Sequence, residues 1–183
     1  MTVHEPFGVC ARIVAYNHPL MFTASRMAPA VAAGNTVIMK PPVQAPLSAL
    51  RLMELIDGVL PAGVMNVITG GQACGEALVA HDLIPKVTLI GSIPTGKAIA
   101  RGAAERLKHV SLELGGKNAL ILYPDADVPR AIAGAVAGMC FTWCGQACSS
   151  TTRLFVHESI YDEVVAGVVE GVKAFCPGIP TDM

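Results

Sequence analysis

Short apolar runs alternate with longer stretches whose apolar residues recur at helical spacing, and this alternation constrains the fold most. The predicted strands are 9–14, 36–39, 64–68, 87–90, 110–114, 119–122 and 153–156. The predicted helices are 19–33, 46–59, 73–80, a segment after Gly96 to about Leu107, 128–141 and 159–175. Strand and helix alternating at this spacing predict βαβ crossovers, so we expect an α/β fold with a parallel sheet.

Ligands of such sheets bind outside the carboxyl ends of the strands. The residues that follow the predicted strands are therefore the candidates for chemistry. They are Asn17, Lys40, Gly70-Gly71, Gly91-Ser92 and Glu113-Leu114-Gly115-Gly116.

The chain is apolar for its size. Of its 183 residues 52% are hydrophobic and only 15% are charged, against about 25% charged in an average soluble domain. This excludes a disordered chain, because there is ample material for a core. It also indicates that part of the surface meets another domain, another subunit or further chain.

Charge and hydropathy exclude several function classes. The net charge is -1 and the 13 Lys and Arg form no basic run, so no nucleic-acid partner is expected. The longest strongly apolar stretch, 131–141, is shorter than the roughly 18 residues of a membrane span. The first residues lack the pattern of a signal peptide, so we expect a cytoplasmic protein.

Six cysteines are expected to be reduced thiols rather than disulfides, because the chain is long and apolar. Cys140, Cys144 and Cys148 recur every four residues, which would align them on one face of a helix. A metal site is one interpretation, but His157 is the only histidine nearby. Core packing or a reactive thiol is favoured, and no metal is expected.

The segment from Gly91 to Ala98 nearly matches a phosphate-binding P-loop. Ala98 stands where the magnesium-binding hydroxyl should be, and Pro94 removes a backbone donor, which argues against a nucleotide hydrolase. A glycine-rich turn at a helix start still suits a phosphate or pyrophosphate. A tight turn without a ligand is the alternative.

Three side chains could carry catalysis. Cys148 lies among small and polar residues, where a substrate could reach a thiolate, whereas structural cysteines lie more often in apolar runs. Glu113 ends an apolar strand, where burial would raise its pKa toward that of a general base; it could instead simply bond to backbone amides. Asn17 could donate to an oxyanion, or form an ordinary turn.

Taken together and in this order, the motifs closely resemble the aldehyde dehydrogenase superfamily over nearly the whole chain. The matching motifs are Glu5-Pro-Phe-Gly8, Tyr16-Asn-His-Pro19, Ala33-Gly-Asn-Thr36, Lys40-Pro41, Pro46-Leu-Ser-Ala49, Pro61-Ala-Gly-Val64, Gly91-Ser92 with Gly96-Lys97, Leu112-Glu-Leu-Gly-Gly-Lys117, Asp125-Ala-Asp127 and Gly145-Gln-Ala-Cys148.

The resemblance implies a catalytic cysteine mechanism. Cys148 would attack an aldehyde to give a thiohemiacetal, Asn17 would stabilise the oxyanion with the Cys148 backbone N–H, and hydride would pass to NAD or NADP. Glu113 would activate the water that hydrolyses the thioester to a carboxylic acid. The implied cofactor residues are Lys40 at the adenosine ribose, Gly91, Ser92 and Gly96 at the pyrophosphate, and Leu114.

The resemblance also implies a Rossmann-like doubly wound parallel sheet, followed by the first part of an α/β catalytic domain. We expect most of a dinucleotide-binding domain in residues 1–115 and the start of the catalytic domain in 116–183. Family members are more than twice this long, so a fragment is expected, with a homo-oligomer for the full-length protein. A catalytically incomplete dinucleotide-binding fragment and a coenzyme A-acylating enzyme are the alternatives.

Two positions depart from the family pattern near the expected site. Val43 stands three residues after Lys40, where NAD-preferring members usually carry a glutamate that holds the ribose hydroxyls. Without that carboxylate the site discriminates less against the 2′-phosphate of NADP, so the sequence is compatible with either NAD or NADP as cofactor. Tyr16 and His18 flank Asn17 where tryptophan and an aromatic residue are common, so the packing around Asn17 must differ.

Overall fold

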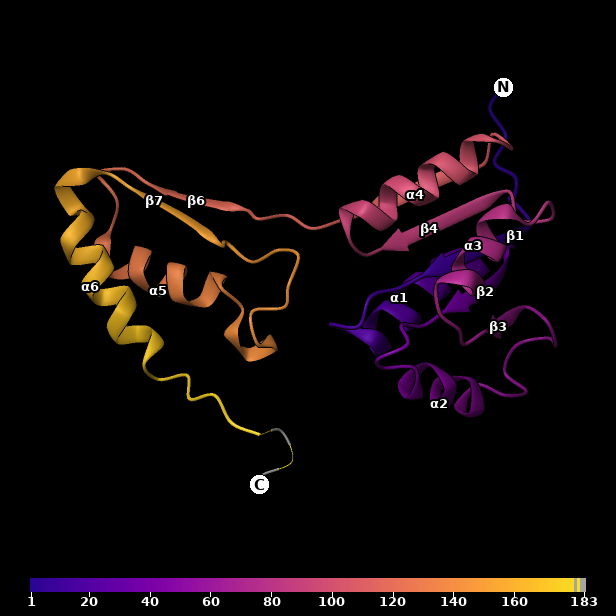
Figure 1. Ribbon diagram of the computed structural model, residues 1–183, viewed down its shortest axis with the longest axis horizontal. Coiled ribbons are helices and arrows are strands. Elements are labelled where there is room, and N and C mark those ends of the chain that lie inside the picture. The colour runs from indigo at the N-terminus through magenta and orange to yellow at the C-terminus, as the bar shows by residue number, and fades with distance from the viewer. Residues whose placement is uncertain (180, 182–183) are drawn as a thin grey trace. The chain divides into compact units, whose positions relative to one another are not determined.

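The computed structural model describes residues 1–179 and 181, and the chain divides into two compact units. The first comprises Met1–Gly115 and the second Gly116–Met183. Each unit has its own sheet (Figure 1).

The first unit holds five strands and four helices in strict alternation. They are β1 (Val9–Ile13), α1 (Pro19–Ala32), β2 (Thr36–Lys40), α2 (Leu47–Leu55), β3 (Met65–Val67), α3 (Gln72–Ala80), β4 (Lys86–Ile90), α4 (Ile93–Ala104) and β5 (His109–Glu113). Every strand pairing is parallel, in the order β3-β2-β1-β4-β5. The predicted doubly wound α/β sheet is confirmed.

The direction in which successive strands are added to the sheet reverses between β1 and β4. The segment with α3 carries the chain from β3 back across the sheet to the other side of β1. Side chains alternate across the strands and so feed two cores. One core joins Ala11, Val87 and Leu89 to α3 and α4, and the other joins Val37 and Met39 to α1 and its neighbours. The two pairs of helices therefore cover opposite faces of the sheet, and the reversal point opens at the carboxyl ends of β1 and β4.

The second unit is a smaller α/β body. It consists of β6 (Ala119–Leu122), α5 (Val128–Gly138), a 3₁₀ turn η1 (Phe141–Trp143), β7 (Arg153–Val156), a second 3₁₀ turn η2 (Glu158–Ile160) and α6 (Tyr161–Val172). The strands β6 and β7 pair in parallel. Gly167 lets α5 and α6 approach closely, because a Cβ there would lie 2.3 Å from Ile132 Cδ1.

The helix predicted over 128–141 is too long, and it ends at Gly138. The Gly138 carbonyl accepts from the Thr151 backbone N–H at 2.9 Å, which turns the helix end toward the strand that follows. Cys140 and Cys144 both have positive φ angles of 55°, in the left-handed region. The expected row of three cysteines on one helical face is therefore wrong.

Other predicted helices also shorten at their ends. The helix predicted over 46–59 spans only Leu47–Leu55, and the last helix begins at Tyr161 and ends at Val172. Within the described part of the chain, no helix combines the length and the apolar character needed to cross a bilayer.

Candidate active site and cofactor pocket

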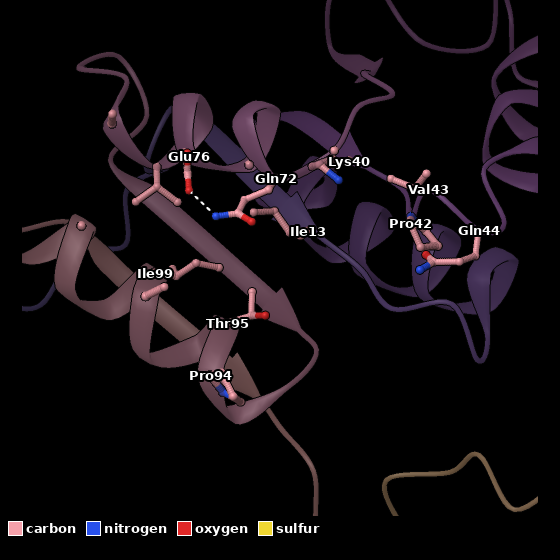
Figure 2. A pocket seen from close by; sticks show the side chains of 16 residues that line it. Ile13, Lys40, Pro42, Val43, Gln44, Gln72, Glu76, Pro94, Thr95 and Ile99 are labelled. Atoms are coloured by element: carbon pink, nitrogen blue, oxygen red, sulfur yellow. Dashed lines mark hydrogen bonds between the residues drawn. The ribbon is translucent and has the colours of Figure 1, made fainter.

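A pocket of about 610 Å³ lies within the first unit, where the ends of β1 and β2 meet α3 and α4 (Figure 2). Strand ends supply Ile13 and Lys40, and the helices supply the longer walls. The lining residues are Ile13, Lys40, Pro42, Val43, Gln44, Gly71, Gln72, Gly75, Glu76, Val79, Ala80, Pro94, Thr95, Ala98, Ile99 and Gly102. The pocket therefore lies at the carboxyl edge of the sheet, between α3 and α4.

Lys40 is the cation of this pocket. It is the last residue of β2, and only 7% of its surface is exposed. Among residues 1–179 and 181, no ion pair or side-chain hydrogen bond involves its ammonium group. Gly75 leaves room beside it, since a Cβ at Gly75 would lie 4.0 Å from Lys40 Cε. A nearly buried lysine whose ammonium has no internal partner is suited to bind a polar or anionic ligand.

The wall formed by α3 carries polar side chains that the sequence analysis missed. Gln72 Nε2 donates to Glu76 Oε1 at 2.7 Å, one helical turn away. Figure 2 shows this pair on one side of the pocket and Thr95 and Ile99 of α4 on another. The Gly70-Gly71 turn after a strand was the available signal, because it placed the start of α3 at the carboxyl edge.

Val43 also lines the pocket, and 63% of its surface is exposed. The position three residues after Lys40 thus contributes an apolar side chain and no carboxylate.

The turn from Gly91 to Gly96 is built around the start of α4. Ser92 caps the helix, its Oγ accepting from the Thr95 backbone N–H at 3.3 Å. A Cβ at Gly96 would lie 2.8 Å from Leu114 Cδ2, so glycine allows α4 to pack closely against the end of β5. Of the five predicted cofactor residues only Lys40 lines the pocket, whereas Gly91, Ser92, Gly96 and Leu114 lie at this turn.

Asn17 and Glu113 lie at the same edge of the five-stranded sheet. Asn17 is half-buried between β1 and α1, and Glu113 is the last residue of β5. The Glu113 carbonyl accepts from the Gly91 backbone N–H at 3.0 Å, which ties β5 to the glycine turn. The expected burial of Glu113 is wrong: its side chain is exposed, because α1 and α2 pack over β2 and β3 and leave that face of β5 open.

Cys148 lies in the second unit, on an exposed loop between η1 and β7. Its carbonyl accepts from Asn118 Nδ2 at 2.8 Å, and the same amide reaches the Ser150 carbonyl at 3.3 Å. The backbone of Gly116 also lies close to this loop, since a Cβ at residue 116 would lie 2.4 Å from the Cys148 carbonyl oxygen. The segment before β6 therefore fixes the backbone of the cysteine loop.

The six cysteines differ in their surroundings, and all are free thiols. Cys10 is buried in β1, and this burial raises the pKa of its thiol, although the positive charges of Arg12 and Lys86 oppose the effect. Cys144, Cys148 and Cys176 are exposed. An exposed thiol on a tethered loop is accessible to a substrate.

The predicted catalytic residues are divided between the units. The first unit brings Asn17 and Glu113 to one sheet edge, and the second unit carries Cys148. That the three meet at one aldehyde stays a prediction. No group of three or more His, Cys, Asp or Glu side chains that could hold a metal occurs among residues 1–179 and 181.

Comparison with known proteins identifies the family. The family model described as "Aldehyde dehydrogenase family" matches residues 1–183. The aldehyde dehydrogenase tropH of Talaromyces stipitatus is 59% identical over 182 residues, which are 99% of this chain and 35% of that protein. The chain belongs to the aldehyde dehydrogenase family, which confirms the resemblance seen in its motifs.

Solved structures agree with this assignment. The structure of 3,6-anhydro-L-galactose dehydrogenase in complex with NAP has a TM-score of 0.92 and 39% identity, covering 97% of this chain and 38% of that one. The NAD+ complex of an aldehyde dehydrogenase from Bacillus cereus has a TM-score of 0.89 and 42% identity, covering 93% and 35%. The chain spans little more than a third of the length of these proteins.

Proposed function

We propose that the chain is the part of an NAD(P)-dependent aldehyde dehydrogenase that binds the dinucleotide and carries the nucleophilic cysteine. The observation that carries this proposal is the pocket between α3 and α4 at the carboxyl ends of β1 and β2, with the unpaired ammonium of Lys40 in its wall. The similar solved structures include complexes with NAD or NADP, which supports the same ligand class here.

In this proposal residues 1–115 are most of the dinucleotide-binding domain and residues 116–183 begin the catalytic domain. Lys40 binds the ribose of the adenosine, and the turn of Gly91, Ser92 and Gly96 faces the pyrophosphate at the start of α4. Backbone N–H groups and the helix dipole at such a start favour negative charge. Leu114 packs beneath the turn and maintains its shape.

The chemistry begins at Cys148. Its thiolate attacks the aldehyde carbon and forms a C–S bond, while the carbonyl electrons move to oxygen. The amide of Asn17 and the backbone N–H of Cys148 donate to that oxyanion. A bound nicotinamide cofactor would supply the acceptor for the hydride that leaves the former aldehyde carbon. Glu113 takes a proton from water, which attacks the resulting thioester, releases the carboxylic acid and restores the Cys148 thiolate.

A dinucleotide-binding segment without turnover is the second candidate. It is favoured by the location of the pocket and of Lys40 within the first unit alone. Catalysis needs reacting atoms held close to an attack geometry, whereas binding needs only the first unit. A homo-oligomeric whole protein belongs to the same proposal and rests on the family resemblance. A cytoplasmic location also stays a proposal, which rests on the sequence pattern.

The test is titration of NAD and of NADP into the purified protein, followed by measurement of NAD(P)H formation with aliphatic and aromatic aldehydes. Binding with turnover supports the dehydrogenase, and binding without turnover supports the second candidate. Absence of dinucleotide binding contradicts both.

Two cysteine variants complete the test. C148A should abolish any turnover and leave dinucleotide binding unchanged. C144A is the matched control, because Cys144 is exposed on the same loop region. Equal loss of turnover in both variants would contradict the role of Cys148.

A further inference from the structure

We propose that Glu76 on α3, held by Gln72, sets the cofactor preference of the pocket and makes it favour NAD over NADP. The inference rests on the proposed function and concerns a residue outside the motifs that carry the family resemblance. It assigns to α3 a role in discriminating a ribose hydroxyl from a 2′-phosphate.

The distribution of charge in the pocket is the first support. Among its lining residues only Lys40 and Glu76 carry a charge, one of each sign. In the described part of the chain no cation pairs with Glu76, whose partner is the neutral amide of Gln72. No cation in this part of the chain therefore offsets the one acidic side chain of the pocket lining.

The hydrogen-bonding character of the α3 wall is the second support. Gln72 Nε2 donates one of its two N–H groups to Glu76 Oε1 at 2.7 Å, which leaves Gln72 Oε1 and Glu76 Oε2 as acceptors and one N–H of Gln72 as a donor (Figure 2). The acceptors match the hydroxyl and amino donors of an adenosine. A 2′-phosphate is dianionic or nearly so, and the negative charge of the Glu76 carboxylate repels it.

The identity of residue 43 is the third support. Val43 lines the pocket three residues after Lys40 and brings an apolar side chain to it. The loop after β2 therefore supplies no carboxylate to the pocket, and Glu76 of α3 is the carboxylate on which discrimination depends in this chain.

The pair is also built to hold its geometry. Gln72 and Glu76 are four residues apart on one helix, the spacing at which side chains meet on the same face. Gly75, between them, keeps the approach to Lys40 open, since a Cβ there would be 3.9 Å from Ile13 Cδ1 and 4.0 Å from Lys40 Cε. Lys40 and the Gln72–Glu76 pair line the same pocket, so a ligand that fills it meets both.

The experiment is a titration of NAD and NADP into the native protein and the E76Q variant. Glutamine keeps the size and the hydrogen-bonding capacity of residue 76 but removes its charge. We expect the ratio of the NADP to the NAD dissociation constant to fall about fivefold to tenfold in E76Q, mostly through tighter NADP binding. The control is E54Q, because Glu54 is exposed on α2, pairs with Arg51 and does not line the pocket.

A second variant, E76K, reverses the charge and should bind NADP more tightly than NAD. In the native protein the ratio of the NADP to the NAD dissociation constant should also fall as KCl rises from about 0.05 M to about 0.5 M. Salt screens the repulsion between the exposed Glu76 carboxylate and the 2′-phosphate. An unchanged ratio in both E76Q and E76K overturns this inference alone, provided that the native protein binds either dinucleotide. Binding of neither dinucleotide by the native protein overturns the proposed function and this inference with it.

Discussion

The side-chain amide of Asn118 donates to the carbonyl oxygen of Cys148 at 2.8 Å, across 30 positions of sequence. The same amide reaches the Ser150 carbonyl at 3.3 Å, and Ser150 is itself buried. One half-buried amide thus joins the segment before β6 to both sides of the cysteine loop. The backbone of the proposed nucleophile is held by a residue that does not touch its thiol.

N118D should destabilise the second unit. The variant places a carboxylate against two carbonyl oxygens, so the hydrogen bonds are lost and replaced by repulsion. We expect the free energy of unfolding, measured by urea denaturation, to fall by about 1–3 kcal/mol. N66A is the control, because Asn66 makes only a local, exposed bond to Gly63. Equal losses in the two variants would show that Asn118 does not hold the loop.

G116A should also be destabilising. Its Cβ would stand 2.4 Å from the Cys148 carbonyl oxygen, and a backbone atom cannot move away as a side-chain end can. We expect the free energy of unfolding to fall by about 1–3 kcal/mol. The matched control is G134A in α5, where nothing lies within 4 Å of the added Cβ and alanine is the better helix former. The free energy of unfolding of G134A should rise by about 0.5–1 kcal/mol. A G116A protein whose free energy of unfolding does not fall would show that the close approach to Cys148 is absent.

The sequence predicted the parallel sheet and the strand ends well, because hydrophobic periodicity and glycine turns are local signals. It placed Asn17, Lys40 and Glu113 at the carboxyl ends of their strands for the same reason. It did not predict that Glu113 is exposed, because the cover of β5 depends on which strands α1 and α2 pack against.

Long-range contacts were beyond the sequence pattern. The bond between Asn118 and Cys148 depends on the parallel pairing of β6 and β7, which no local signal specifies. The four-residue spacing of Cys140, Cys144 and Cys148 suggested a helix, but the contact of Gly138 with Thr151 ends α5 first. Helix propensity is a weak signal where tertiary bonds determine the end of a helix.

K40M should separate binding from stability. Methionine keeps the length of the side chain but removes the charge that is available to the ligand. We expect dinucleotide affinity to fall about 10-fold to 100-fold, as for a lost charge-assisted hydrogen bond. The thermal midpoint should stay close to the native value, because in the described part of the chain no ion pair or side-chain hydrogen bond of the Lys40 ammonium is lost.

K173M is the control for that variant. Lys173 is exposed, pairs with Glu170 and lies outside the pocket, so its loss should change neither affinity nor midpoint appreciably. A K40M protein that binds dinucleotide as tightly as the native one would remove Lys40 from the proposed site.

Cys10 should give the protein an alkaline loss of stability. Burial raises the pKa of its thiol above the ordinary value of 9.0, although Arg12 and Lys86 oppose the shift. At a pH below that value the thiol is neutral in both states, and its contribution to stability is fully present. As pH rises further the unfolded chain releases the proton first, so the free energy of unfolding falls until the folded thiol ionises too.

Urea denaturation of the native protein and C10A from about pH 8 to about pH 11 should show a steeper decline of the free energy of unfolding in the native protein. C176A, which removes an exposed thiol, should decline as the native protein does; parallel declines for native and C10A would mean that Cys10 titrates alike in both states.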